Sequence, residues 1–290
     1  MKRTNFSIVT LLAVAMMFVF ASCTKDGVYK PKKKISKIYE TVTTDPNPER
    51  VLKESWSWDG KLLSRIDYYG GDFLTFKYEK GQLTSFADDE NRIEINYDSK
   101  GKLIDNAQMY YGNVQTMNFT FQHEKNLLTS YTVEYLPSIA DNAKSARLIE
   151  NLFRFITPEV AETEAALCTK RATNNSKDNV VYKTEFTYDG KNIVKATTNT
   201  GETYTYTYTD YKNPFYGLMV EMGIESWSKN AVSTCVKTEA NRPDYNYTYT
   251  YKADGKIPTQ VTENLTWSLT VGSITSTHTE TTVTDYEYTK

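Results

Sequence analysis

One pattern recurs along the chain and constrains the fold more than any other feature. In all copies but one, where Ile95 stands first, two aromatic residues separated by one residue precede a short polar turn with Gly or Asn, and apolar residues follow the turn. The copies occupy residues 56–66, 76–86, 95–105, 119–131, 186–196 and 249–261. Alternating aromatic residues are typical of a half-buried strand, and pairs such as Asp-Gly supply the positive φ of a tight hairpin. Each copy is therefore predicted to be one β-hairpin of a repeated unit.

Hairpins joined in series predict an all-β fold, a large antiparallel meander. Counting the alternating segments predicts about 14–16 strands. The usual handed twist of strands should leave this sheet curled or closed toward a barrel. One segment departs from the pattern, since residues 137–170 carry apolar residues at helical spacing. We expect a helical insertion at about residues 138–170 within the β domain.

The N-terminus has the form of a secretory signal. Lys2 and Arg3 precede an apolar run at residues 8–20, and small residues follow that run. Such a run is shorter than the roughly 20 apolar residues that span a bilayer, and its flanks are those of a cleaved signal. Residues 1–22 are therefore predicted to be a signal peptide.

The end of this signal carries a second feature. The segment Phe20-Ala21-Ser22-Cys23 resembles the lipobox of bacterial lipoproteins, in which the chain is cut before the Cys and the thiol receives a diacylglyceryl group. This resemblance predicts lipid attachment at Cys23, and the alternative is ordinary secretion with an incidental Cys. Residues 23–34, which contain Gly, Pro and several Lys, then form a lipidated tether. Residues 35–290 form a single β domain.

Together with these hairpins and the lipobox, the segment TYTYTYTDYKNPFYG at residues 203–217 is similar to a group of Bacteroidetes lipoproteins of unknown function. The resemblance implies a porin-like fold, an antiparallel meander that closes toward a barrel. It implies a lipid-anchored protein of the cell envelope, at the outer membrane on its periplasmic or surface face. It supplies no catalytic residue and no cofactor.

The strand pattern argues against a lipid-facing wall. Charges occur at both alternating positions between residues 35 and 136, as in Lys53 and Glu54. A charge on a lipid face costs about 2–4 kcal/mol at the bilayer midplane. We therefore expect a barrel or curled sheet in water, held at the membrane by its lipid.

Residue types that perform catalysis or bind metals are scattered. The two histidines, His123 and His278, fall in different hairpins, and the acidic segment 87–91 lacks the spacing of a calcium loop. Nucleophile elbows and phosphate-binding loops are absent from the sequence. A formal net charge of −2 gives no basic surplus for nucleic acid. We expect no catalytic residue, no metal site, no cofactor and no nucleic-acid partner.

Aromatic side chains and two cysteines are the other candidates. Trp56, Trp58, Trp227 and Trp267 are candidate contacts for a glycan, although packing against a curved sheet also explains aromatic residues. In an oxidising compartment Cys168 and Cys235 are a candidate disulfide, whose proximity the sequence does not show.

The function predicted from these features is that of a non-enzymatic envelope lipoprotein that binds or scaffolds. Its partners would be the membrane, through the lipid anchor, and a glycan or a protein. The alternative is a carrier of a small lipid or glycan that uses the interior of the barrel.

Overall fold

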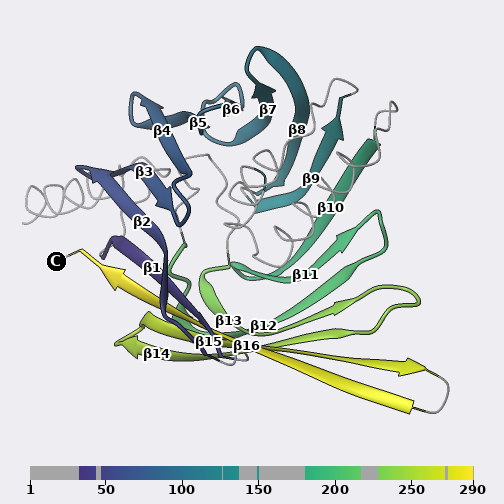
Figure 1. The fold of residues 1–290 in the computed structure, drawn as a ribbon. Helices are drawn as coiled ribbons and strands as arrows, with labels where there is room; N and C mark the ends of the chain where they lie inside the picture. Colours follow the sequence, from purple (N-terminus) through teal and green to yellow (C-terminus); the bar gives the residue numbers. More distant parts are fainter. Residues whose placement is uncertain are drawn as a thin grey trace, which may run out of the picture.

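The fold is a barrel of antiparallel strands, seen in a computed structural model that describes residues 33–43, 47–125, 127–136, 149, 180–216, 228–271 and 274–289 (Figure 1). Sixteen strands form one closed sheet. They are β1 (Ile35–Val42), β2 (Val51–Asp59), β3 (Leu62–Tyr68), β4 (Phe73–Glu79), β5 (Gln82–Ala87), β6 (Asn91–Tyr97), β7 (Ile104–Tyr111), β8 (Val114–Glu124), β9 (Leu127–Tyr135), β10 (Val180–Asp189), β11 (Asn192–Thr198), β12 (Thr203–Lys212), β13 (Asn230–Thr238), β14 (Tyr245–Asp254), β15 (Ile257–Val271) and β16 (Ile274–Tyr288).

Neighbours in sequence are neighbours in the sheet, and the first strand pairs with the last. Ile38 of β1 lies opposite Tyr286 of β16 in an antiparallel ladder. This pairing closes the barrel, and closure removes the open edges that a flat meander would leave. The predicted all-β antiparallel meander is confirmed, and the sheet is closed rather than merely curled.

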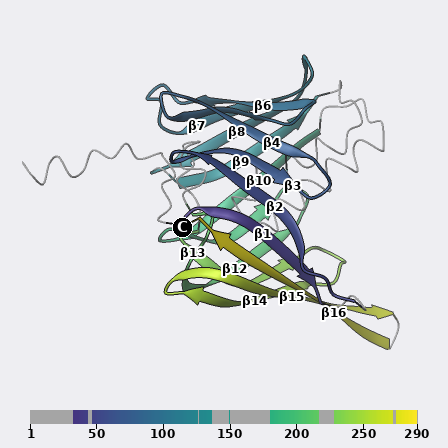
Figure 2. The same ribbon diagram turned by 60° about the vertical axis from the view of Figure 1, so that its left-hand side comes forward.

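The barrel has two different rims, which Figure 2 shows from the side. The rim that we call the terminal rim contains the start of β1, the end of β16 and the tight turns that follow the even-numbered strands β2, β4, β6, β8, β10 and β14. In each of these hairpins the pairing register shifts near the turn, as between Thr187 and Tyr188 in β10. The opposite rim, which we call the far rim, contains the turn between β15 and β16.

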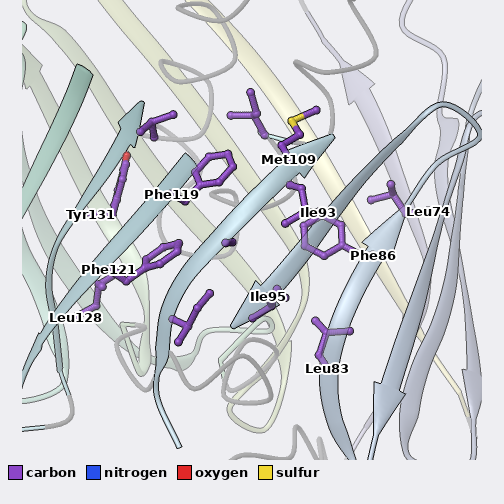
Figure 3. Packing of buried hydrophobic residues seen from close by; sticks show 14 of the residues in the cluster. Leu74, Leu83, Phe86, Ile93, Ile95, Met109, Phe119, Phe121, Leu128 and Tyr131 are labelled. Atoms are coloured by element: carbon purple, nitrogen blue, oxygen red, sulfur yellow. The ribbon is translucent and has the colours of Figure 1, made fainter. Parts of the chain in front are cut away.

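The core lies on one face of the sheet. Buried apolar side chains recur on alternate positions of neighbouring strands, and Figure 3 shows Phe86, Ile93 and Met109 side by side on three of them. In direct register, Phe86 lies opposite Ile93 and Ile93 opposite Met109. Closure of the sheet places this face inside the barrel.

The predicted insertion at about residues 138–170 lies outside the described residues, apart from Ile149. Ile149 is helical, fully buried and part of the same hydrophobic cluster as the strand side chains. The interior of the barrel is therefore filled in part by a side chain that does not come from the strands.

A ring of aromatic donors, which we call the rim belt, ties neighbouring hairpins together near the terminal rim. Seven even-numbered strands each send one Tyr hydroxyl or Trp N–H to a main-chain carbonyl of the preceding odd-numbered strand. The pairs are Trp58 with Ile35, Tyr78 with Leu63, Tyr97 with Leu83, Tyr188 with Leu128, Tyr208 with Ile193, Tyr251 with Val232 and Tyr288 with Pro258. Many of the aromatic residues of the hairpin pattern therefore form hydrogen bonds that join neighbouring hairpins.

Candidate functional site

The two faces of the barrel wall have opposite character. In β12, Tyr204 and Tyr206 are buried, while Thr205 and Thr207, each of which follows one of them, are exposed. The same alternation holds in β14, where Tyr247 is buried between exposed polar residues. Because the buried face is the inner one, Tyr204, Tyr206 and Tyr247 point inward, while the threonines next to them in β12 and β14 point outward.

Charged side chains on the outer face pair with one another. Between the buried residues of a strand, basic and acidic residues two positions apart meet on the outside of the barrel. These pairs are Arg65–Asp67 at 2.7 Å, Arg92–Glu94 at 2.8 Å and Lys183–Glu185 at 2.5 Å. Guanidinium groups also cover aromatic rings: Arg50 over Tyr39 at 3.4 Å, Arg65 over Phe73 at 4.0 Å and Arg92 over Tyr110 at 4.3 Å. Such a wall is chemically suited to water.

Inside the barrel, two of the tryptophans chosen as glycan candidates belong to a packed aromatic cluster. Trp56 is only 5% exposed, and its ring centroid lies 6.2 Å from that of Trp58 and 6.2 Å from that of Phe215. Phe215 also meets Tyr286 of β16 at 5.9 Å, edge to face. Phe215 follows β12, so its ring reaches strands several places away around the barrel.

Polar groups in this cluster are hydrogen-bonded. The Trp56 Nε1–H donates to a carboxylate oxygen of Glu54 at 2.8 Å, and the Trp58 Nε1–H donates to the Ile35 carbonyl at 2.8 Å. Buried polar groups with such partners stabilise a unique packing. The geometry gives Trp56 and Trp58 structural contacts and leaves Trp56 little surface for a ligand.

A third candidate, Trp267, lies where the β15–β16 hairpin leaves the barrel. It is half-buried, directly opposite Tyr245 of β14 on one side and His278 of β16 on the other. Its ring centroid lies 6.1 Å from that of Tyr245 and 5.4 Å from that of the exposed His278, which is stacked on it. We call Tyr245, Trp267 and His278 the aromatic row.

Two residues of the neighbouring strands, Lys237 of β13 and Tyr204 of β12, extend the aromatic row along the inner face of the sheet. Lys237 of β13 lies opposite Tyr245 and Tyr204, and its ammonium group is 5.5 Å from the centroid of the Tyr204 ring. Aromatic faces beside a cation and hydroxyl groups are the kind of surface that recognises a polar ring such as a sugar. The row opens to solvent at His278.

Sequence reasoning identified Trp267 but missed Tyr245 and His278 as its neighbours. Both lie on other strands, at positions that become adjacent only through the β14–β15–β16 register. The signal in the sequence was the Tyr and Thr alternation, which specifies the face of each side chain but not the residue opposite it.

Three of the predicted site residues, Cys23, Trp227 and Cys168, lie outside the described residues. Cys235 is fully buried on the inner face of β13. Its disulfide with Cys168, like the lipid on Cys23, stays a prediction.

Among the described residues, no group of three or more His, Cys, Asp or Glu side chains is arranged to hold a metal ion. His123 and His278 lie on β8 and β16, in different parts of the sheet.

No helix in the described part of the chain is long and apolar enough to cross a bilayer.

Comparison with known proteins finds a structural likeness. No protein-family model matches the chain, and no curated protein matches its sequence. Among solved structures, the chain is similar to a porin-like protein from Bacteroides uniformis ATCC 8492, with a TM-score of 0.55 and 11% sequence identity. The match covers 91% of this chain and 100% of that chain. The fold is therefore porin-like.

Proposed function

We propose that the protein is a non-enzymatic envelope lipoprotein whose barrel stands in water beside the outer membrane and binds a partner at its far rim. The observation that carries this proposal is the polarity of the wall. Ion pairs such as Arg92–Glu94 face outward, while Tyr204 and Tyr206 are buried inside. A wall that spanned the bilayer would need the reverse outer face, because charges at the midplane cost about 2–4 kcal/mol.

A lipid on Cys23 would supply the membrane attachment that the wall does not. A lipid anchor with several acyl chains holds a protein stably at a bilayer. β1 begins at Ile35 on the terminal rim, so the predicted tether of residues 23–34 would join the barrel at that rim. The β15–β16 hairpin projects at the other end, as Figure 1 shows. The aromatic row is thereby directed away from the anchored membrane.

The anchor and the wall are tested together with the full chain and with a Cys23→Ser variant that begins at residue 23, because the predicted cut at the lipobox requires Cys23 and the apolar run at residues 8–20 would otherwise hold the variant in the membrane. We expect the lipidated chain to enter the detergent phase of a Triton X-114 separation and the variant to stay in the aqueous phase. An azido fatty acid should label the native chain and not the variant. A variant that stays in the membrane after carbonate extraction would show that the barrel itself spans the bilayer.

The ligand that best fits the aromatic row is a glycan, because Trp267 and His278 offer ring surfaces beside polar groups. A glycan array with the Cys23→Ser chain identifies the ligand. Trp267→Ala is then expected to weaken binding about fivefold or more, because truncating an aromatic anchor costs over about 1 kcal/mol. Tyr69→Ala is the matched control, because Tyr69 is an aromatic residue of the same rim, 71% exposed, but lies at the β3–β4 turn, three strands from β16 in the sheet. Equal loss in both variants, or no array signal, contradicts glycan recognition at this row.

A second candidate function is carriage of a small lipid or glycan inside the barrel. It is favoured by the apolar inner face, on which Met109, Phe119 and Tyr131 are fully buried. Native mass spectrometry of the purified Cys23→Ser chain would reveal a bound lipid as added mass. A protein that never carries such mass, even after incubation with lipid vesicles, is not a carrier of lipid.

A further inference from the structure

The β15–β16 hairpin extends beyond both of its neighbours in the sheet. β15 and β16 pair with each other up to Val271 and Ile274. The ladder between β14 and β15 ends at Trp267, and the ladder between β1 and β16 ends at Thr282. Between residues 274 and 280, β16 therefore has no paired strand on its outer side within the described residues.

One hydrogen bond identifies which main-chain groups face this open edge. The Thr281 carbonyl accepts from the Thr43 N–H at 2.9 Å, so the main-chain N–H and C=O groups of Thr281 point away from β15, toward β1. Main-chain groups of a strand alternate in direction, and the β15–β16 register has no shift. Thr275, Thr277 and Thr279 therefore also direct their N–H and C=O groups to the open edge.

Side-chain contacts support the same assignment. The hydroxyl of Thr279 lies 3.3 Å from that of Thr266, and the hydroxyl of Thr275 lies 3.0 Å from that of Thr270. In antiparallel sheets the closely spaced side chains belong to the pairs that exchange no main-chain hydrogen bonds. The main-chain groups of Thr275 and Thr279 thus point away from β15.

The open edge lacks the features that normally prevent strand pairing. Natural edge strands are protected by Lys, Pro, bulges or inward charges. Residues 274–279 (ITSTHT) contain no Lys, Arg, Asp, Glu or Pro and are rich in β-branched residues. Ile274 is 74% exposed, and Leu269 on the facing strand is 49% exposed. This edge is chemically ready to accept another strand.

We propose that this edge pairs antiparallel with the same edge of a second copy of the chain, around a two-fold axis at Thr277. In this register Thr275 lies opposite Thr279 of the second copy. Ser276 lies opposite His278, and Ile274 opposite Glu280. No like charges face each other, and the outward groups form about six main-chain hydrogen bonds, two for each pair.

A second copy fits this edge better than a charged peptide would. The segment offers no charge before Glu280 that could select a partner of opposite sign. Its threonines place β-branched side chains opposite each other, which is a favourable cross-strand combination. The C-terminus and the tip of the hairpin lie at opposite ends of the barrel (Figure 1). The two barrels of the pair therefore extend in opposite directions from the shared sheet.

Light scattering of the Cys23→Ser chain that begins at residue 23, over a wide range of concentrations, tests the pairing. Edge-to-edge contacts of this size are weak, so we expect the mass to rise from one chain toward two as concentration increases. Thr277→Pro removes an outward N–H at the centre of the pair, and it is expected to abolish the rise. The matched control is Thr270→Pro, which removes an outward N–H from the opposite edge of the same hairpin and should leave the rise unchanged.

A second measurement tests the register. Thr277→Cys should form a disulfide-linked dimer under oxidation, and Thr270→Cys should not. Circular dichroism shows whether the proline variants keep the barrel. The proposal is wrong if the native edge stays monomeric at every concentration, if Thr277→Pro still dimerises, or if both proline variants lose the dimer equally.

Discussion

His123 is the exception in the rim belt. It pairs with Leu128 after a register shift in β8, the position that Tyr188 occupies against Ile193 in β10. Its Nε2 atom is buried and has no hydrogen-bond partner within the described part of the chain. Seven other even-numbered strands use an aromatic donor for this purpose. The bond between β8 and β7 is therefore missing from the belt.

Replacing His123 with Tyr should complete the belt. A net intramolecular hydrogen bond contributes about 0.5–1.5 kcal/mol, so we expect His123→Tyr to raise the free energy of unfolding by about 1 kcal/mol. Urea titration measures the change. Tyr188→Phe is the matched variant and should lower the free energy of unfolding by a similar amount, because it removes the hydroxyl that donates to Leu128. A destabilised His123→Tyr would show that the β8 site has no room for the longer side chain.

The same histidine makes stability depend on pH. Burial lowers the pKa of His123 below its ordinary 6.5, and the charges of Asp98 and Asp105 oppose this shift only in part. As pH falls through 6.5, the unfolded chain binds a proton at His123 before the folded chain does. Folding is therefore favoured above that pH and loses stability as the pH falls toward the lowered folded-state pKa.

Unfolding in urea at a series of pH values checks this direction. We expect the free energy of unfolding to fall between about pH 7.5 and pH 5, and to fall less in His123→Tyr. Because both proteins contain the same carboxylates, the difference between them isolates the histidine. Parallel pH profiles for the two proteins would exclude His123 as the titrating group.

At the scale of the element, each hairpin depends on a turn that the sequence makes recognisable. Gly190, between β10 and β11, has a φ of 59°, and a Cβ added there would meet nothing within 4 Å. A substitution therefore acts through backbone conformation alone. The left-handed region costs a residue with a Cβ about 1–2 kcal/mol.

Gly190→Ala is expected to lower the free energy of unfolding by about 1 kcal/mol, without a change of fold. Thermal and urea unfolding measure the loss. Lys80 gives the complementary test, because it already has a φ of 53° in the β4–β5 turn, so Lys80→Gly should relieve strain there. If Gly190→Ala proved neutral, the turn would have to adopt another geometry.

At the scale of the whole molecule, substitutions on the two faces of β12 can test whether the barrel stands in water or spans a membrane. Thr205 faces outward and is exposed, whereas the adjacent Tyr206 is 3% exposed. In a water-facing wall, Thr205→Lys should change the free energy of unfolding by less than about 0.5 kcal/mol. Tyr206→Lys places an unpaired charge in the core and should prevent stable folding.

The yield of soluble protein and the free energy of unfolding in urea, measured for both lysine variants, test these two expectations. Tyr206→Phe is the control for the inner position, because it keeps the ring and the apolar contacts. A strongly destabilised Thr205→Lys would place a dry environment, such as lipid, against the outer face.

The aromatic donors show which structural features a local sequence pattern predicts and which it does not. Tyr188 and Tyr78 were recognisable as strand residues before a turn. Their bonds to Leu128 and Leu63 were not recognisable, because each acceptor belongs to the preceding hairpin. For the same reason the sequence identified Trp267 without its neighbours in the aromatic row, and it offered Trp56 as a ligand contact although Trp56 is buried against Phe215.

By itself the sequence determined an antiparallel meander of hairpins, because turn chemistry and alternation are local properties of the chain. Only the tertiary structure decided that β1 pairs with β16, that Tyr204 and Tyr206 of β12 face inward, and that Phe215 fills the space beside Trp56 and Tyr286. Each of these depends on residues far apart in sequence, and no local pattern specifies which distant partner a side chain will meet. Closure then made one face of the sheet an interior and left the β15–β16 hairpin as its projecting edge.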